Sequence, residues 1–370
     1  MEKNFLKEKI NIALVGCGRI SKNHINAIVN ENQRCQLVAL CDSSNERILN
    51  AISIYDEASK KNQLPLCNLK KYTDLEKLIE QHNKNQIKVD LIVLATPSGL
   101  HPIQTEMAAK AKIHICTEKP MAINLEDGYK MVEICKKNNV KLFVVKQNRL
   151  NKTLQNLRNL VLENKFGKIA LVTINVFWQR PQEYYDQDEW RGTKKLDGGA
   201  LMNQASHYVD LLEWIIGPLE GLSASIATIS RSIESEDTAV MQLKWKSGIL
   251  GTMAVTMTTY PKNIEGSITI IGDKGSVKLG GIAVNKFDYC YISEPDDNLN
   301  ISDLNYEIES VYGYGHNLYY TNILDVLLEN KKPICDGESG LSSIEIINAA
   351  YVSSKEKKYI NLPLKKDIKM

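Results

Sequence analysis

The chain has 370 residues, of which 43% are hydrophobic and 24% are charged. This length exceeds what one hydrophobic core usually organises, and it indicates two domains. The composition excludes a long disordered or fibrous protein. The formal charge is 46 − 44 = +2, and no basic run is interleaved with aromatic residues. A nucleic-acid-binding surface is therefore excluded, and a small-molecule partner is expected.

No apolar stretch reaches the roughly 18 residues that a membrane span requires, and Met1–Ile10 is charged rather than a signal sequence. We therefore expect a cytoplasmic protein without a membrane partner. The eight cysteines are scattered, with no C-x-x-C pair and no histidine nearby at metal-ligand spacing. We expect reduced, mostly buried thiols and no metal site.

Residues 1–149 alternate short apolar runs with amphipathic stretches, which is typical of a parallel sheet covered by helices on both faces. Thr73 and Glu76 have capping-box spacing and Asn124 can cap a further helix, so both place helices between strands. We predict a doubly wound Rossmann domain. Its predicted strands are residues 10–16, 36–42, 90–96, 113–118 and 141–146.

Residues 150–370 show a different pattern, which predicts a second, α/β domain. A helix over 152–164 is ended by Gly167, and strands with two-residue alternation follow. Asp273-Lys274-Gly275 predicts a hairpin turn. The elements expected here are strands at 170–178, 249–260, 268–271 and 277–279, an acidic loop at 294–312, and helices at 316–329 and 341–355.

The alternation gives the strands of the second domain two different faces. The apolar face is predicted to meet helices, and it holds Ala170, Val172, Ile174, Val176, Trp178, Ile249, Met253, Val255 and Met257. The opposite face is polar but almost uncharged, unlike a fully solvated surface. It holds Thr173, Asn175, Thr252, Thr256, Thr258, Ser267 and Thr269, and we expect it to contact another subunit.

A glycine turn follows the first predicted strand and opens a helix, with the pattern G-x-G-x-x-S from Gly16 to Ser21. Gly16 permits a tight turn, Gly18 lets the backbone approach a pyrophosphate, and Arg19 and Ile20 begin the helix whose N–H groups face the anion. Asp42 ends the second strand, where a carboxylate binds the adenosine ribose and repels a 2′-phosphate. We therefore expect NAD rather than NADP, the alternative being that Asp42 only caps the next helix.

Further polar residues follow the third and fourth long strands, at the edge where doubly wound folds bind ligands. A cofactor contact is expected for Thr96, Pro97, Ser98, His101, Glu118 and Lys119. Lys119 is unusual because its ammonium must be desolvated or paired in such a cleft. The alternative is a surface lysine whose stem lies along the protein.

In the second domain, Gly198–Asp210 predicts a helix that places Asn203 and His207 four residues apart on one face. A histidine suits proton acceptance near pH 7, and an asparagine offers both a donor and an acceptor. A lone helical histidine is more often a packed core residue, so this pair would not suffice by itself.

Together these residues resemble the Gfo/Idh/MocA oxidoreductase family. Gly16–Ser21, Glu118-Lys119-Pro120 and the helix with His207 occur in the family's order and spacing. The resemblance implies an NAD-dependent enzyme with a Rossmann domain, residues 1–149, and an α/β domain with a large open, mainly antiparallel sheet, residues 150–370. Asn203 stands where the family usually has Asp, which argues against the sugar and inositol dehydrogenases that use an Asp there.

Four longer runs resemble the family members that oxidise the sugar 3-hydroxyl of a UDP-linked N-acetylglucosaminuronate for O-antigen and related surface polysaccharides. These runs are residues 144–151, 177–193, 197–212 and 260–271. The resemblance implies a homotetramer that holds NAD tightly, and some such members reoxidise the cofactor with 2-oxoglutarate. The alternatives are a dehydrogenase or reductase of another nucleotide sugar or free sugar, and an NAD-binding sensor without turnover.

Oxidation of an alcohol requires a base for the hydroxyl proton, and both Lys119 and His207 are candidates. Asn203 would orient the sugar, and Asp210 would fix the tautomer of His207. The substrate's carboxylate and diphosphate need cationic or N–H partners, for which the candidates are Asn148, Arg149, Arg180, Arg191, Lys262 and His316. Gln147, Trp190 and Arg191 are expected to contact the cofactor.

Overall fold

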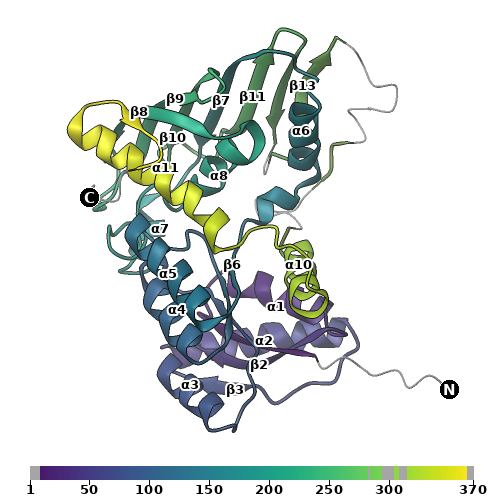
Figure 1. Ribbon diagram of the computed structural model, residues 1–370. Coiled ribbons are helices and arrows are strands. Elements are labelled where there is room, and N and C mark those ends of the chain that lie inside the picture. The colour runs from purple at the N-terminus through teal and green to yellow at the C-terminus, as the bar shows by residue number, and fades with distance from the viewer. Residues whose placement is uncertain (1–8, 282–283, 294–303, 308–314, 365–370) are drawn as a thin grey trace, which may run out of the picture. The chain divides into compact units, whose positions relative to one another are not determined.

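The computed structural model describes residues 9–281, 284–293, 304–307 and 315–364 (Figure 1). The chain divides into two compact units. Unit 1 extends to Ala122 and includes Asp127–Val145 and His316–Gly340, whereas unit 2 comprises Ile123–Glu126, Lys146–Gly315 and the chain from Leu341. The boundary predicted at 149/150 differs from this division. The main difference is the return of His316–Gly340 to unit 1, which no local pattern reveals.

Unit 1 contains a six-stranded parallel sheet of order β3-β2-β1-β4-β5-β6. The five predicted strands are present, with ends that differ by a few residues at most, and the three-residue β3 joins them at one edge. Their bounds are β1 Ile10–Val15, β2 Cys35–Cys41, β3 Lys70–Tyr72, β4 Leu91–Leu94, β5 His114–Thr117 and β6 Leu142–Val144. Because the strands are parallel, their carboxyl ends lie along one edge.

Two of the helices between these strands, α2 (Asn45–Lys61) and α3 (Leu75–Asn83), begin at polar caps. Ser44 accepts a hydrogen bond from Arg47 N at α2, and Asp74 accepts one from Glu76 N at α3. The predicted cap at Thr73 is therefore wrong by one residue. Asp74 is the N-cap, because its backbone is extended and its carboxylate accepts the hydrogen bond from Glu76 N. The helices are α1 Ser21–Asn30, α2 Asn45–Lys61, α3 Leu75–Asn83, η1 Ser98–Leu100, α4 His101–Lys110, α5 Leu125–Asn138 and α10 Gly315–Glu329.

Unit 2 contains an eight-stranded sheet of order β13-β12-β11-β7-β10-β9-β8-β14, in which only the β10·β7 pair is parallel. The predicted open, mainly antiparallel sheet and the hairpin turn at Asp273–Gly275 are confirmed. The strands are β7 Ile169–Phe177, β8 Leu219–Ala227, β9 Thr238–Trp245, β10 Leu250–Thr256, β11 Glu265–Gly272, β12 Gly275–Gly280, β13 Lys286–Ile292 and β14 Ile360–Asn361. Most of the loop expected at 294–312 lies outside the described residues.

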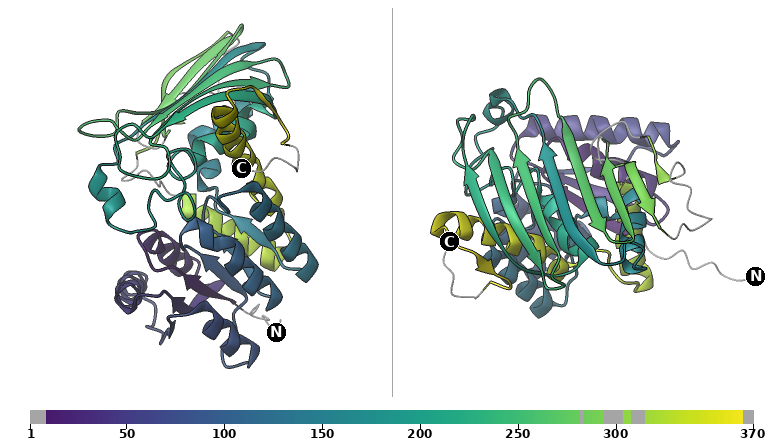
Figure 2. Two further views of the ribbon diagram at one scale, coloured as in Figure 1. Left: turned by 90° about the vertical axis from the view of Figure 1, so that its left-hand side faces the viewer. Right: turned by 90° about the horizontal axis from the view of Figure 1, so that it is seen from above.

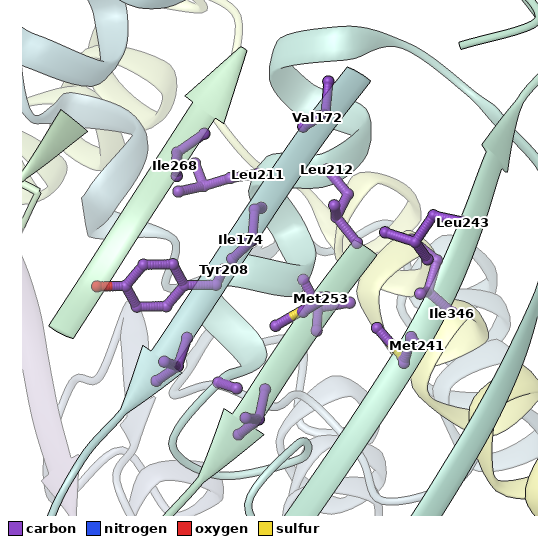
Figure 3. Packing of buried hydrophobic residues seen from close by; sticks show 14 of the residues in the cluster. Val172, Ile174, Tyr208, Leu211, Leu212, Met241, Leu243, Met253, Ile268 and Ile346 are labelled. Carbon is purple, nitrogen blue, oxygen red and sulfur yellow. The ribbon is translucent and has the colours of Figure 1, made fainter. Parts of the chain in front are cut away.

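One face of this sheet carries the core of unit 2 (Figure 3). Val172, Ile174 and Met253 are buried as predicted, whereas Ala170 is exposed at the start of β7. Tyr208, Leu211 and Leu212 of α8 and Ile346 of α11 pack against them. The helices of unit 2 are η2 Gln147–Leu150, α6 Lys152–Leu162, α7 Gln182–Asp186, α8 Ser206–Ile216 and α11 Gly337–Glu356.

The opposite face carries no helix among the described residues (Figure 2). Thr173 lies between Thr252 and Thr269 on neighbouring strands, so the predicted threonine row is present. The same face exposes large apolar side chains, namely Val240, Leu250, Ile271, Tyr289 and Tyr291, which are 41–64% exposed. Nowhere in the described part of the chain is a helix both long and apolar enough to cross a bilayer.

Candidate active site

The glycine turn after β1 contains two glycines with different roles. Gly16 has φ +96°, and a Cβ there would lie 2.5 Å from the carbonyl carbon of Ala95 at the end of β4. Its freedom is therefore needed by the fold itself. A Cβ on Gly18 would meet no atom within 4 Å. The protein thus has no internal use for a glycine at this position, which fits a backbone kept clear for an external group such as a pyrophosphate.

Asp42 follows β2 and faces the same turn. Its Oδ2 accepts a hydrogen bond from Cys17 N at 2.8 Å, and its Oδ1 accepts one from Ser44 N at 2.9 Å. Ser44, not Asp42, caps α2, so the alternative of a merely capping Asp42 is not what the structure shows. An open pocket of about 540 Å³ lies beside it, lined by Ser43, Ser44, Glu46, Arg47 and Asn50. The Asp42 carboxylate is therefore held by the glycine turn on one side and by the start of the next loop on the other.

His101 lies at the carboxyl edge of the sheet, between the segments that follow β4 and β5. His101 is fully buried, with Nδ1 3.0 Å from the Pro120 carbonyl oxygen and Nε2 3.0 Å from the Thr96 carbonyl oxygen. Burial lowers the pKa of His101, so the ring is neutral and donates to one of these carbonyls at a time. Thr96 Oγ1 donates to Gln104 Oε1 at 2.6 Å, and Pro97 and Ser98 follow at η1.

Glu118, the residue before Lys119, is buried and ionised. His24 Nε2 lies 3.1 Å and His316 Nε2 3.4 Å from its Oε1, while Lys119 N donates to its Oε2 at 3.0 Å. Burial alone would raise the pKa of Glu118, but the hydrogen bonds from His24 and His316 hold it well below its usual range. His316, predicted as a substrate ligand, therefore faces Glu118 in unit 1, and Lys119 itself is half-buried.

In unit 2 His207 lies in the first turn of α8 and is buried. The amide nitrogen of Gln147 lies 3.3 Å from His207 Nε2. Asn203 does not share the helix with His207 as predicted, because α8 begins only at Ser206 and Asn203 lies in the preceding turn. Asn203 Nδ2 donates to Asp197 Oδ1 there.

Asp210 does not orient His207 as predicted. Arg149 binds it with two hydrogen bonds, from Nε at 2.8 Å and from Nη2 at 2.7 Å, and Lys146 Nζ lies 3.4 Å away. Burial would raise the pKa of Asp210, but Lys146 and Arg149 lower it. These two N–H groups of Arg149 are already committed to Asp210 and are not available to a substrate anion. Gln147, rather than Asp210, is the neighbour that orients the imidazole.

A second buried carboxylate supports the turn that precedes α8. Glu236 Oε1 accepts a hydrogen bond from Leu201 N at 2.9 Å and lies 3.3 Å from the Tyr351 hydroxyl. Burial raises the pKa of Glu236 to about 7. Asp197 Oδ2 accepts from Gly192 N at 2.7 Å, so two acidic residues hold the backbone on either side of this turn.

The remaining predicted residues fall in two places in unit 2. Arginine side chains contact aromatic rings in the segment between β7 and the turn that precedes α8. Arg180 lies 5.3 Å from the Trp178 ring centroid. Arg191 lies 4.5 Å from the Tyr184 ring centroid and 4.7 Å from that of Trp190. Such cation–π contacts restrict where a guanidinium group can lie. Lys262 is exposed between β10 and β11, and Asn148 is buried in η2 next to Arg149.

Sequence reasoning missed His24, Lys146 and Glu236. A signal existed for Lys146, because it ends the apolar run of residues 141–146 as Lys119 follows that of 113–118. His24 and Glu236 carry no comparable signal, since their partners are distant in the sequence.

A parallel sheet with a glycine turn and an acidic residue at its carboxyl edge defines a dinucleotide-binding enzyme. Two family models match the chain: residues 10–146 match the oxidoreductase family's NAD-binding Rossmann fold, and residues 158–362 match its C-terminal alpha/beta domain. The chain therefore belongs to the GFO/IDH/MocA oxidoreductase family, as the resemblance of its motifs predicted.

Two solved structures are similar to the whole chain. The WlbA dehydrogenase from Bordetella pertussis, in complex with NADH and UDP-GlcNAcA, is 47% identical, with a TM-score of 0.90 and coverage of 98% of this chain and 100% of that one. The WlbA dehydrogenase from Chromobacterium violaceum, with the same two ligands, is 45% identical, with a TM-score of 0.86 and coverage of 97% of each chain. The myo-inositol 2-dehydrogenase of Thermotoga maritima is 25% identical over 95% of this chain and 98% of that protein.

Proposed function

We propose that the protein is a UDP-N-acetyl-2-amino-2-deoxyglucuronate 3-dehydrogenase, which oxidises the sugar 3-hydroxyl to a ketone with NAD. The observation that carries this proposal is the likeness, at 45–47% identity over nearly the whole chain, to two dehydrogenases solved with NADH and UDP-GlcNAcA. The substitution of Asn203 for the family's usual Asp, found in the sequence, supports a substrate other than a free sugar or inositol.

NAD supplies the hydride acceptor, and the residues of unit 1 fit it. Gly18 leaves the space that a pyrophosphate needs, the first turn of α1 provides N–H groups, and Asp42 has free lone pairs for ribose hydroxyls although it already accepts two backbone hydrogen bonds. A 2′-phosphate would meet the Asp42 carboxylate, which favours NAD over NADP.

The chemistry of the proposed step requires a proton acceptor. The O–H bond of the 3-hydroxyl breaks and its proton passes to a side chain, the C3–H bond breaks, and its electron pair leaves as hydride to the nicotinamide C4 while the C=O bond forms. We propose that Lys119 and His207 serve this step, His207 as the acceptor and Lys119 as the donor that stabilises the 3-oxygen. Gln147, 3.3 Å from His207, supports an oriented imidazole.

The diphosphate and carboxylate need cations. We assign them to Arg180, Arg191 and Lys262, because the first two lie over aromatic rings and the third is exposed. Arg191 uses only its Nε for Asp188 Oδ2, at 3.0 Å. Arg149 is less suited, since Asp210 already binds it with two hydrogen bonds.

The direct test is NADH formation at 340 nm with UDP-GlcNAcA. UDP-GlcNAc, UDP-glucuronate and free N-acetylglucosaminuronic acid serve as matched substrates that lack the carboxylate, the acetamido group or the nucleotide. We expect turnover with UDP-GlcNAcA at least about 10-fold above each analogue, because each lacks a group that the site must bind. Equal turnover with another nucleotide sugar would replace this proposal by the broader one of a nucleotide-sugar dehydrogenase.

The proposed roles of Lys119 and His207 in proton transfer can be tested with the variants Lys119→Met and His207→Asn. Each variant should lower turnover by about 10²–10⁴-fold, while the affinity for NAD stays within a few-fold of that of the unchanged protein. If His207 is the acceptor, the acid limb of the pH–rate profile should be absent from the residual activity of His207→Asn. An acid limb that persists in His207→Asn would indicate that Lys119, not His207, accepts the hydroxyl proton.

We further propose that the uncovered sheet face of unit 2 joins subunits of a homotetramer. Five exposed apolar side chains beside a threonine row support it, because a monomer seldom leaves so large an apolar patch in water. The register also places Lys244, Glu265 and Lys278 on this face, which therefore carries more charge than the sequence indicated. Light scattering should report an oligomer, and Leu250→Lys should weaken it. A monomer at micromolar concentration would contradict this proposal.

The proposed reaction places the protein in the cytoplasm, where NAD and nucleotide sugars are found, in the synthesis of a surface polysaccharide such as O-antigen. Reoxidation of the bound NADH by 2-oxoglutarate is part of the proposal. It predicts that added 2-oxoglutarate raises the yield of the 3-keto sugar beyond one equivalent per subunit.

A further inference from the structure

Three of the six histidines of the chain surround the segment of residues 118–120. His24 comes from α1, His101 from α4 and His316 from α10, and all three belong to unit 1. His24 and His101 are fully buried, and His316 is 5% exposed. Burying three imidazoles against one short segment is costly unless their ring nitrogens are used.

His24 forms hydrogen bonds with Glu118 and Tyr320, and these partners determine which of its ring nitrogens carries the proton. An ionised carboxylate only accepts, so His24 Nε2–H donates to Oε1 at 3.1 Å. His24 Nδ1 must then accept, and the Tyr320 hydroxyl lies 2.9 Å away to donate to it. Burial lowers the pKa of His24, which agrees with a neutral ring. Tyr320 from α10 and His24 from α1 therefore form a chain of donors that ends at Glu118.

The other titratable groups whose charge acts on Glu118 are Cys116 of β5, His101 of α4 and His316, which lies on α10 like Tyr320. Burial raises the pKa of Cys116 well above its ordinary value, so this thiol adds no charge. His316 Nε2 lies 3.4 Å from the same Oε1, farther than His24 Nε2 at 3.1 Å. His24 is thus the closer of the two imidazole donors.

The segment is held at both ends. Glu118 Oε2 accepts from the backbone N–H of Lys119 at 3.0 Å, and the carbonyl of Pro120 lies 3.0 Å from His101 Nδ1. The backbone of Lys119 therefore lies between a carboxylate that accepts its own N–H and a carbonyl that faces the buried His101 ring.

We propose that His24 is a positioning residue, which fixes the Glu118 carboxylate and, through it, the backbone from which the Lys119 side chain acts. This inference rests on the proposed role of Lys119 as the donor that stabilises the 3-oxygen of the sugar. It assigns no contact between His24 and the substrate, so loss of His24 should lower kcat more than it raises KM.

The same three side chains could instead ligate a metal ion, because one atom from each of His24, Glu118 and His316 lies within 4.8 Å of the others. The hydrogen-bond reading predicts that the purified protein contains no stoichiometric metal. One tightly bound ion per subunit, released together with the loss of activity by a chelator, would overturn the proposal.

The test compares His24→Leu with His24→Gln. The Gln amide nitrogen occupies nearly the place of Nε2 and can still donate to Glu118, whereas Leu cannot. We expect kcat to fall by about 10- to 100-fold in His24→Leu, with KM changed by less than about 3-fold, and to recover most of the way in His24→Gln. His24→Asn, whose amide is too short to reach Glu118, replaces His24→Leu if the latter does not fold.

His114→Gln is the matched control, because His114 lies at the opposite end of β5 and accepts a hydrogen bond from Lys141 N at 3.0 Å. It should keep kcat within about 2-fold of the unchanged protein. An equal loss of kcat in His24→Leu and His24→Gln, or a loss confined to KM, would refute the positioning role.

Amide hydrogen exchange tests the inference without any substrate. Exchange at the Lys119 amide should quicken in His24→Leu and stay slow in His24→Gln and His114→Gln, because only the first change frees the Glu118 carboxylate. Unchanged exchange in His24→Leu would overturn the inference. If exchange responds as expected but UDP-GlcNAcA is not oxidised by the unchanged protein, the proposed function fails, whereas the anchoring of the Lys119 backbone by His24 through Glu118 stands.

Discussion

Glu236 offers a prediction whose size follows from the structure. Its side chain is buried, and Oε1 accepts a hydrogen bond from Leu201 N in the turn that precedes α8. Burial raises its pKa from the ordinary 4.5 to about 7 in the folded chain. In Glu236→Gln the amide oxygen can still accept from Leu201, but the group no longer titrates.

The direction in which pH changes the stability follows from proton linkage. Between pH 4.5 and about 7 the folded chain keeps this proton while the unfolded chain releases it, so the free energy of unfolding falls as pH rises through this window. A difference of roughly 2.5 units, at about 1.36 kcal/mol per unit, corresponds to a change on the order of 3 kcal/mol. Glu236→Gln should therefore gain stability relative to the unchanged protein as pH rises from 4.5 to 8.

Chemical denaturation at pH 4.5, 6, 7 and 8 measures this difference directly. The matched control is Glu234→Gln, because Glu234 is exposed and only accepts a hydrogen bond from Lys194 N at 3.0 Å. That variant should differ from the unchanged protein by less than about 0.5 kcal/mol at every pH. A Glu236→Gln difference that varies by less than about 1 kcal/mol across this range would refute the reasoning.

Three further predictions concern the two units. Gly16→Ala should lower the melting temperature, because its Cβ would lie 2.5 Å from the Ala95 carbonyl carbon. Gly18→Ala should leave the melting temperature unchanged and weaken NAD binding, as measured by calorimetry. Equal effects of the two substitutions on melting and on NAD binding would contradict these roles. Asp42→Ala should weaken NAD and narrow its advantage over NADP in binding titrations, and an unchanged ratio would leave Asp42 only structural. Asp210→Asn removes the anion between Lys146 and Arg149 and should cost about 3–5 kcal/mol of unfolding free energy at pH 7; a loss below about 1 kcal/mol would contradict a buried ion cluster.

Local patterns predicted much of the fold. Strands such as β1 in unit 1 are buried on both faces, so their sequences are continuous apolar runs. In β7 and β10 apolar and polar residues alternate, because only one face of each strand is buried. The strands β8 and β13 were not identified individually, because small, charged and exposed residues blur their alternation. The strand β9 was also missed, although every second residue from Ala239 to Trp245 is buried. The return of α10 to unit 1 depends on contacts such as Tyr320 with His24, which no local pattern shows.

The candidate site was predictable where one short motif carries the chemistry, as in Gly16–Ser21 and at Lys119. It was not predictable where a role depends on a distant partner. Asp210 lies one helical turn from His207, which suggested that it orients the imidazole, but Arg149 and Lys146 bind it instead. Asn203 was placed on a helix that begins only at Ser206.

The most direct measurement of the central claim is transfer of deuterium from C3 of the sugar. The protein is incubated with NAD and UDP-GlcNAcA labelled with deuterium at C3, and the reduced nicotinamide is analysed by mass spectrometry and NMR. UDP-GlcNAcA labelled at C4 is the matched control. We predict one deuterium at the nicotinamide C4 from the C3-labelled sugar and none from the C4-labelled sugar. Transfer from C4, or no transfer from C3 while NAD is bound, would contradict the assignment as a 3-dehydrogenase.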